Sequence, residues 1–325
     1  MKAAVYTRYG SPDVVSLSDV PRPVLPPNGV VVRVRATTVS SGDARLRSAK
    51  APAGFGLLLR LGFGVLGPRK RTLGTEMAGE VVEVGAHSRF AVGDRVFAML
   101  GGALGGHAEY VAIRDAGAIA PLPRELGFEQ GAALAFGGTT ALYYLRDKAK
   151  LRGGERVLVN GASGAVGSAA LQLAKHFGAH VTAVCSGDNA DLVTALGADR
   201  VIDHTRQDFT TVGERFDVIM DTVGNCSFAR CAPALAHDGR LLLVVASLGQ
   251  MLGALVRPVR SGRRVLCGVT PERAEDLRFL ARLAEVGAYR PLIDCIFPFD
   301  RIALAHARVD TQRKRGNVIV TLDVA

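Results

Sequence analysis

A short apolar strand that runs into a glycine-rich turn constrains the fold of this chain more than any other feature. The strand, residues 156–160, is followed by the turn Gly161-Ala162-Ser163-Gly164-Ala165-Val166-Gly167 and the amphipathic stretch Ser168–Phe177. In such a repeat the first glycine allows a tight turn, the second lets a pyrophosphate approach the backbone, and the third lets helix and strand pack closely. The amides that open the next helix can then bind phosphate oxygens. The turn predicts a dinucleotide site, although an ordinary strand–turn–helix corner can contain the same glycines.

The residues downstream favour the dinucleotide interpretation. Further apolar runs alternate with helical patterns at Leu192–Leu196 and Pro271–Val286; the runs are Val181–Cys185, Arg200–Asp203, Phe216–Asp221, Gly239–Val245 and Arg263–Gly268. Short, nearly continuous apolar strands between helices are typical of a parallel sheet that is covered on both faces. We therefore predict an α/β fold with a doubly wound nucleotide-binding domain.

The beginning and end of the chain have a different pattern. Short strands separated by Pro and Gly turns indicate a small, irregular β-barrel-type domain; they are Ala3–Thr7, Gly29–Val39, Glu80–Val84, Asp94–Met99 and Ala108–Ala112. Helical patterns at Phe128–Ala135 and Thr139–Ala149 lead into the nucleotide-binding domain. Strands at Ile293–Pro298 and Asn317–Asp323, around a helix at Arg301–Val309, return to the first domain. The predicted boundaries are 1–122, 123–290 and 291–325.

Composition narrows the class of protein further. The chain has 325 residues, 48% of them hydrophobic and 22% charged, and a net charge of +10. The basic residues are scattered apart from Arg69-Lys70-Arg71 and Arg313-Lys314-Arg315, so nucleic-acid binding is not expected as the main role. The start of the chain has no signal-type apolar core and no segment is long enough to span a membrane, which predicts a cytoplasmic protein. The five cysteines form no C-x-x-C pair, so we expect reduced thiols rather than a disulfide framework.

Five motifs follow one another along the chain, at residues 74–81, 92–97, 106–111, 137–141 and 161–167. In this order they resemble the medium-chain dehydrogenase/reductase superfamily, and in detail its zinc-free quinone oxidoreductase (zeta-crystallin-like) branch, and the resemblance extends to residues 315–319. It implies a GroES-like catalytic domain and a Rossmann domain, with the active site in the cleft between them. It also implies a small-molecule substrate, and we expect a homodimer.

The resemblance also bears on zinc. Where zinc-dependent members carry a cysteine and a histidine, this chain has Ser40 and Thr75. Hydroxyl groups are poor zinc ligands, and the carboxylates of Asp43 and Glu76 alone would make a weak site. We expect a metal-free enzyme. Without zinc, the chemistry that remains is hydride delivery to an electron-poor carbon of a quinone or an α,β-unsaturated carbonyl, whose enolate then takes a proton from water or a side chain.

The cofactor is predicted from the second strand of the nucleotide domain. NAD-specific folds place an acid at its end, whereas this strand ends in Cys185 and Ser186. Asp188 would repel a 2′-phosphate if it pointed inward, or it caps the helix Asn189–Leu196. His204 replaces a tyrosine common in relatives and can pair with a 2′-phosphate when protonated. We predict NADPH, with NADH as the alternative.

The candidate site residues have structural alternatives. As catalytic residues we predict Ser40, which is otherwise a turn residue, and Asp43, which otherwise fixes the local loop. Thr140 is placed at a helix N-terminus, where it contacts the cofactor or only caps the helix, and Asn317 stands where relatives often carry lysine. The full set of predicted cofactor-binding residues is Thr140, Gly161, Ser163, Gly164, Ala165, Val166, Gly167, Ser186, Asn189, His204, Leu248, Gly268 and Asn317.

Other interpretations stay open. The apolar segment 53–67 is interpreted as a mobile lid or substrate wall, or as a subunit contact, with a peripheral membrane anchor aided by Arg69-Lys70-Arg71 as a further alternative. The chain can also be a zinc-free alcohol or ketone oxidoreductase. It can, finally, be a catalytically idle NADPH-binding protein with a structural or RNA-binding role.

Overall fold

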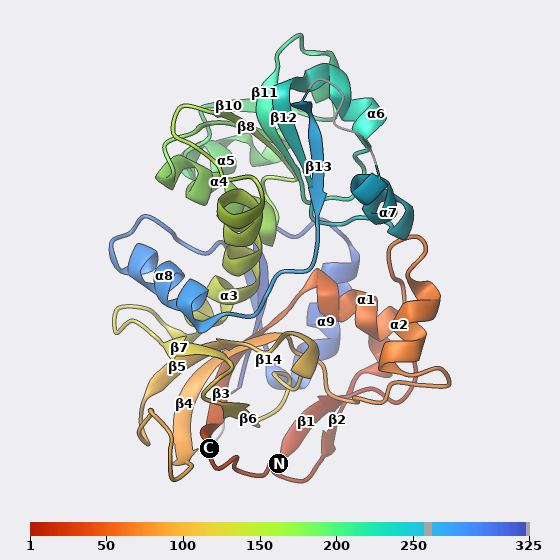
Figure 1. Cartoon of the computed structure of the whole chain (residues 1–325). Coiled ribbons are helices and arrows are strands. Elements are labelled where there is room, and N and C mark those ends of the chain that lie inside the picture. Colours follow the sequence, from red (N-terminus) through yellow and green to blue (C-terminus); the bar gives the residue numbers. More distant parts are fainter. Residues whose placement is uncertain (257–261, 323–325) are drawn as a thin grey trace. The chain divides into compact units, whose positions relative to one another are not determined.

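A computed structural model describes residues 1–256 and 262–322, and they form two compact units (Figure 1). Unit 1 contains Met1–Ala51, Gly56–Thr139 and Glu272–Ala325, and unit 2 contains Pro52–Phe55 and Thr140–Pro271. The chain thus returns to unit 1 after unit 2, as the terminal strand patterns predict. The predicted boundaries differ from these bounds because residues 123–139 and 272–290 pack within unit 1. Gly131, for example, lies so close to Leu122 and Ala78 that a Cβ would come 2.6 Å and 3.1 Å from their side chains.

Unit 1 is built on a seven-stranded sheet whose central strand, β3 (Gly29–Val39), is buried along most of its length. The sheet order is β14 (Ile293–Pro298), β15 (Asn317–Thr321), β3, β4 (Glu76–Val84), β5 (Arg95–Met99) and β7 (Ala118–Pro121), and β6 (Tyr110–Arg114) also pairs with β3. A separate antiparallel pair joins β1 (Lys2–Val5) to β2 (Ser16–Asp19). Only Arg33 and Arg35 of β3 are half-buried, and the other residues of the strand are buried, so that both of its faces are covered.

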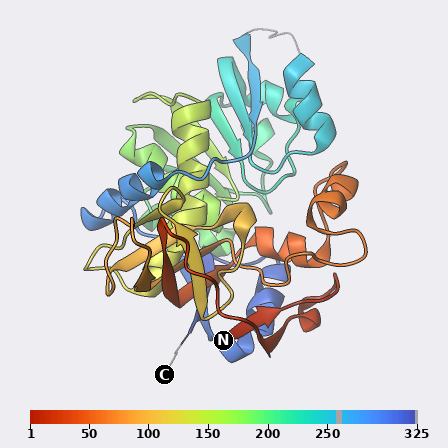
Figure 2. The ribbon, with the colours of Figure 1, turned by 60° about the horizontal axis from the view of Figure 1, so that its bottom comes forward.

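The helices that belong wholly to unit 1 within the described residues can be followed by their colours in Figure 2. They are α1 (Ser41–Ser48), α2 (Gly56–Phe63), α8 (Ala274–Glu285) and α9 (Ile302–Asp310). The predicted strand at the carboxyl end reached Asp323, a residue that lies outside the described part of the chain.

Unit 2 has the predicted doubly wound architecture. Its six-stranded sheet has the order β10 (Arg200–Asp203), β9 (His180–Cys185), β8 (Arg156–Asn160), β11 (Phe216–Asp221), β12 (Leu235–Leu243) and β13 (Arg264–Cys267). Every neighbouring pair is parallel. The helices are α4 (Ala165–His176), α5 (Ala190–Ala195), α6 (Phe228–Cys231) and α7 (Leu248–Val256). Because the strands are parallel, all the loops that follow them lie along one edge of the sheet.

One helix differs from the sequence prediction. Residues 128–142 form a single helix, α3 (Phe128–Leu142), which continues as a π-helical segment, Tyr143–Lys148. The prediction of a new helix at Thr139 is wrong, because Gly137 and Gly138 do not interrupt α3. A Cβ on Gly138 would lie 2.7 Å from Leu280 and 3.2 Å from Tyr289. Gly138 therefore allows α3 to pack closely on α8 and the segment behind it.

Short 3-10 turns complete the described chain, at Pro12–Val14, Gly101–Ala103, Gly187–Asn189, Phe209–Thr211, Ala232–Ala234 and Phe299–Arg301. No helix within the described residues has both the length and the apolar character needed to cross a bilayer.

Candidate cofactor and active site

The turn after β8 has the geometry of a phosphate-binding turn. Gly161 has a φ of 83°, and a Cβ there would lie 2.7 Å from the Thr222 hydroxyl. A Cβ on Gly167 would lie 2.1 Å from the carbonyl oxygen of Gly161. The tight turn and the close helix–strand contact predicted from the first and third glycines are therefore both present.

The middle glycine, Gly164, leaves space in front of helix α4. It is the N-cap residue, with a φ of −80°, and the nearest heavy atom to a Cβ would be the Gly161 carbonyl oxygen at 3.5 Å. The residues from Ser163 to Val166 are all half-buried. The amides of the first helical turn have no acceptor within their own helix and carry the positive end of the helix dipole. The turn thus has the open face and the donors that a pyrophosphate requires.

Three predicted polar residues come together beside this turn. The Asn189 side-chain amide lies 3.0 Å from the Ser186 hydroxyl and 3.3 Å from the Ser163 hydroxyl. Asn189 is the N-cap of α5, which begins at Ala190, so Asp188 does not hold the N-cap position that one of its two alternative interpretations gave it. Asp188 instead lies in the 3-10 turn that precedes it.

The end of β10 borders the same region. A Cβ on Gly187 would lie 2.7 Å from the Asp203 carboxylate, whose Oδ1 accepts hydrogen bonds from the Thr205 amide and hydroxyl. These hydrogen bonds hold the pKa of the Asp203 carboxyl below its ordinary value. His204 is exposed, and its amide donates to the Cys185 carbonyl. Residues from β8, β9 and β10 therefore meet at one edge of the sheet.

A buried polar network that the sequence analysis missed fixes the middle of this edge. The Asn160 side-chain amide donates to Asp221 over 2.9 Å, which joins the ends of β8 and β11. Asp221 also accepts from the backbone amides of Val223 and Cys226, at 3.0 Å and 2.9 Å. An asparagine and an aspartate that each end a buried apolar strand are the signals by which this network can be found.

The predicted loops after β12 and β13 lie on the same edge. Leu248 opens α7, where Ser247 and Gln250 form a reciprocal pair of side chain–amide hydrogen bonds. The carbonyl of Gly268 accepts from the hydroxyl of Tyr144 over 2.8 Å, and the same hydroxyl lies 3.0 Å from the Leu243 carbonyl. Tyr144, which the sequence analysis did not single out, therefore holds the ends of β12 and β13 together.

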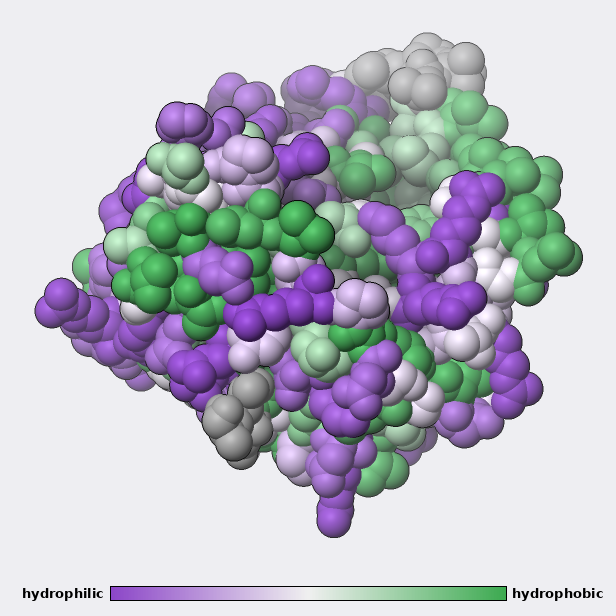
Figure 3. All heavy atoms as spheres, turned by 90° about the horizontal axis from the view of Figure 1, so that it is seen from below, coloured by the Kyte–Doolittle hydropathy of each residue, from purple (hydrophilic) through white to green (hydrophobic). Residues whose placement is uncertain are grey.

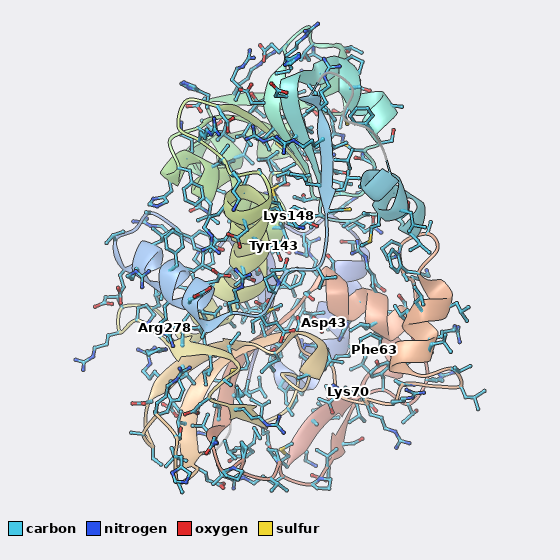
Figure 4. All side chains as sticks on the ribbon, viewed as in Figure 1. Asp43, Phe63, Lys70, Tyr143, Lys148 and Arg278 are labelled. Carbon is cyan, nitrogen blue, oxygen red and sulfur yellow. The ribbon has the colours of Figure 1, made fainter. Side chains whose placement is uncertain are left out.

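In unit 1, the predicted catalytic pair forms a capping box at the start of α1 (Figure 4, with Asp43 labelled). The Ser40 hydroxyl donates to Asp43 over 2.6 Å, and the Asp43 amide lies 3.1 Å from the Ser40 hydroxyl oxygen. Asp43 also accepts from the amides of Ser40 and Gly74, at 2.8 Å and 3.0 Å. The geometry supports the structural alternative for Asp43, because its carboxylate is occupied with backbone amides.

Glu76, the other residue of the acidic pair, is fully buried. Its carboxylate accepts from the Thr38 hydroxyl and, over 2.5 Å, from the Phe136 amide of α3. Burial raises the pKa of Glu76 to about 7, against the lowering effect of these two hydrogen bonds. The neighbouring Thr75 hydroxyl is buried and has no hydrogen-bond partner in the described part of the chain. Within that part, no three His, Cys, Asp or Glu side chains are grouped closely enough to hold a metal ion.

Two predicted cofactor residues have surroundings that the sequence did not indicate. Thr140 lies inside α3 and is buried, so its placement at a helix N-terminus is wrong. Asn317 is buried at the start of β15, where its side-chain amide donates to the Leu292 carbonyl over 3.0 Å. The position of Thr140 follows from the uninterrupted helix α3, and that of Asn317 follows from the register of β15. Both features depend on residues distant in sequence.

Comparison with known proteins agrees with this architecture. Residues 26–124 match the model of the alcohol dehydrogenase GroES-like domain, and residues 196–320 match that of the zinc-binding dehydrogenase family. The chain is 32% identical to the quinone oxidoreductase of Sus scrofa, over 99% of this chain and 98% of that protein. It is 30% identical to an NADPH-dependent alkenal/one oxidoreductase of Arabidopsis thaliana, over 98% of this chain and 79% of that protein.

A solved quinone oxidoreductase from Coxiella burnetii superposes with a TM-score of 0.87 at 26% identity, over 99% of both chains. The chain belongs to the medium-chain dehydrogenase/reductase superfamily, in its quinone oxidoreductase branch. The family resemblance noted from the motifs is thereby confirmed. The cytoplasmic location and the homodimer stay predictions.

Proposed function

We propose that this protein is an NADPH-dependent reductase that delivers hydride to a quinone or an α,β-unsaturated carbonyl without zinc. The names of its relatives, a quinone oxidoreductase and an alkenal/one oxidoreductase, support the substrate class. The observation that carries the proposal is the open, half-buried glycine turn at the N-terminus of α4, bordered by the Ser163, Ser186 and Asn189 side chains.

The residues of unit 2 fit a nicotinamide dinucleotide. The first-turn amides of α4, behind Gly164, would hold the pyrophosphate, and the polar side chains beside them would hold the adenine ribose. The loops that begin at Leu248 and Gly268 lie at the same sheet edge and would border the rest of the cofactor. When bound, the reduced cofactor supplies a hydride for an electron-poor carbon.

The preference for NADPH rests on the end of β9. No carboxylate follows Cys185 directly, and Ser186 and Asn189 can donate to phosphate oxygens. Asp203 lies nearby, but it is hydrogen bonded to Thr205 and paired at 3.6 Å with Arg206, whose side chain is 87% exposed. We add Arg206 to the candidates for a 2′-phosphate contact, because a guanidinium can bind two phosphate oxygens at once.

The proposal that the enzyme works without zinc rests on the side chains that could ligate a metal. Ser40 and Thr75 offer only hydroxyl oxygens. The Asp43 carboxylate accepts hydrogen bonds from two backbone amides, and burial raises the pKa of Glu76. Thiolate and imidazole, the ligands that zinc prefers, are missing from this set of four residues. Quinones and enones already carry their electron sink, so orientation and hydrogen bonding are sufficient for their reduction.

Steady-state consumption of NADPH with a small quinone and with an enone tests the proposal. We expect turnover with both, an enone product in which the carbon–carbon double bond is reduced, and less than stoichiometric zinc by elemental analysis. Reduction of the enone carbonyl instead would favour a zinc-free alcohol or ketone oxidoreductase. Absence of turnover with intact NADPH binding would favour a catalytically idle binding protein.

Isothermal titration with NADPH and NADH tests the cofactor preference separately. We expect tighter binding of NADPH, and a loss of that preference in Arg206→Gln but not in Arg124→Gln, a matched change on the surface of unit 1. One charge-assisted hydrogen bond contributes about 1.5–3 kcal/mol, or roughly tenfold or more in affinity. Equal affinities for the two cofactors in the unaltered protein would contradict the assignment.

A further inference from the structure

Helix α2 exposes an unusual amount of apolar surface for a short surface helix. Leu57 is 70% exposed, Leu58 and Leu61 are each more than half exposed, and Val65 and Leu66 extend the exposed set beyond the helix. No residue of α2 is buried. Exposed apolar side chains in one contiguous patch indicate an interaction surface rather than chance. We call residues 57–66 the α2 patch.

The α2 patch is held with its apolar face outward. On a helix, Leu57, Leu58 and Leu61 share one side, and Phe63 lies on the other. Phe63 packs against the core of unit 1. The loop behind it is fixed because the Tyr9 hydroxyl donates to the Gly64 carbonyl over 2.8 Å and the Arg69 amide donates to the Phe63 carbonyl over 2.7 Å. The patch is therefore presented by a defined structure.

The sequence around the α2 patch is basic. Between Ala44 and Thr75 it contains no Asp or Glu and seven Arg or Lys residues, of which Arg47 is buried and paired with Asp310. Arg60 lies within the patch, and Arg69, Lys70 and Arg71 follow it and are exposed. Figure 4 labels Phe63 and Lys70 on this segment. In the space-filling view from below, apolar side chains gather at the right-hand margin, with hydrophilic ones beside them (Figure 3).

We propose that the α2 patch docks this protein peripherally on an anionic lipid surface. The apolar side chains of Leu57, Leu58 and Leu61 would enter the boundary between headgroups and acyl chains, and the cations at positions 60 and 69–71 would pair with lipid phosphates. A lipid surface fits better than a protein groove, because the exposed leucines stand beside exposed cations. Arg69 and Arg71 are exposed, and Arg60 and Lys70 hydrogen bond to backbone carbonyls, those of Val65 and of Gly102 and Ala103, and keep their charge. The inference does not depend on the reductase activity.

Co-sedimentation of the full-length protein with vesicles tests the proposal. We expect binding to vesicles that contain phosphatidylglycerol and much weaker binding to pure phosphatidylcholine, with binding lost at high salt. The triple variant Leu57→Ser/Leu61→Ser/Leu66→Ser should bind more weakly by a factor on the order of a thousand or more, because the loss of each leucine from the lipid boundary lowers the affinity by roughly tenfold or more. Arg69→Gln/Arg71→Gln should lower binding about tenfold or more, since each cation near the surface contributes about 1 kcal/mol.

Matched control variants test whether vesicle binding depends on the α2 patch itself or on any exposed apolar side chain or cation. Val24→Ser/Val286→Ser removes two apolar side chains that are 88% and 77% exposed elsewhere in unit 1, and Arg124→Gln/Arg301→Gln removes two distant cations. Both controls should bind vesicles as the unaltered protein does, and circular dichroism should show that every variant is folded.

Equal binding to neutral and anionic vesicles, or equal loss in the control variants, would overturn the proposal. Analytical ultracentrifugation tests the alternative that the α2 patch joins two copies of this chain. If the protein does not bind vesicles and the triple leucine variant converts a dimer into a monomer, the patch is a contact between copies of this chain and the proposal is wrong.

Discussion

Two glycine-rich stretches of this chain, residues 137–138 and 161–167, are followed by similar small and apolar residues but have opposite structures. The second is a tight turn with Gly161 at a φ of 83°, and the first lies in the middle of the continuous helix α3. The difference lies in what surrounds them. A buried strand, β8, runs directly into the turn, whereas Gly137 and Gly138 follow residues that are already helical.

Of these two stretches, only the one that a strand runs directly into forms a turn. In α3, Gly138 serves close packing against Leu280 and Tyr289, and the Phe136 amide donates to the buried carboxylate of Glu76. In the turn after β8, the glycines serve both backbone conformation and packing. Substitutions of these glycines and of Glu76 separate the two roles.

Gly167→Val should be the most damaging change in either stretch. A Cβ at this position meets backbone atoms, the Gly161 carbonyl oxygen at 2.1 Å and the Ala162 Cα at 2.8 Å, which cannot move independently. We expect a loss of on the order of 4 kcal/mol or more in the free energy of unfolding, measured by urea denaturation. Gly164→Ala is the control, since its Cβ would have no contact closer than 3.5 Å. Similar stabilities for the two variants would show that the helix is not packed against the turn as described.

Glu76 should make stability depend on pH through its contact with α3. Burial raises its pKa from 4.5 to about 7, so between these values the folded state binds more protons than the unfolded state. The contribution of Glu76 is therefore fully present below pH 4.5 and is lost as the pH rises to 7. The total change is about 3 kcal/mol.

Denaturation of the unaltered protein and of Glu76→Gln across this pH range measures the effect. The difference in unfolding free energy between them should shift by about 3 kcal/mol in favour of Glu76→Gln as the pH rises. The exposed residue Glu125 supplies the control, because Glu125→Gln should leave the pH profile of the unaltered protein unchanged. A constant difference between Glu76→Gln and the unaltered protein would show that Glu76 is ionised throughout.

Gly138→Ala should change the free energy of unfolding less than Gly167→Val or the titration of Glu76 does. Its Cβ would meet the ends of two side chains, Leu280 at 2.7 Å and Tyr289 at 3.2 Å, which can shift. Overpacking of about 1–3 kcal/mol is partly offset by the gain of about 1 kcal/mol from replacing glycine within a helix. We expect a net loss of about 1 kcal/mol in the free energy of unfolding and no change in NADPH affinity. A stabilised variant would mean that the helix is not in close contact at this position.

Local patterns in the sequence were enough to predict the parallel sheet and the turn. Strands β10 and β11 match their predicted bounds because each is an apolar run ended by an aspartate. The continuity of α3 was not predictable in this way, because Leu280 and Tyr289 lie more than 140 residues beyond Gly138. The capping box of Ser40 and Asp43 was an intermediate case. Its spacing is visible in the sequence, but the amide of Gly74, which also binds Asp43, is brought there only by the fold.

The measurement that tests the central claim most directly is the thermal melting of Gly164→Val with and without NADPH. Gly164 has a φ of −80° and open space around it, so the substitution should leave the protein folded. A β-branched side chain at the N-terminus of α4 would, however, occupy the position where a pyrophosphate approaches the amides. We predict a melting temperature close to that of the unaltered protein and no rise on addition of NADPH. A folded variant whose melting temperature rises with NADPH as much as that of the unaltered protein would contradict the assignment of this turn as the cofactor site.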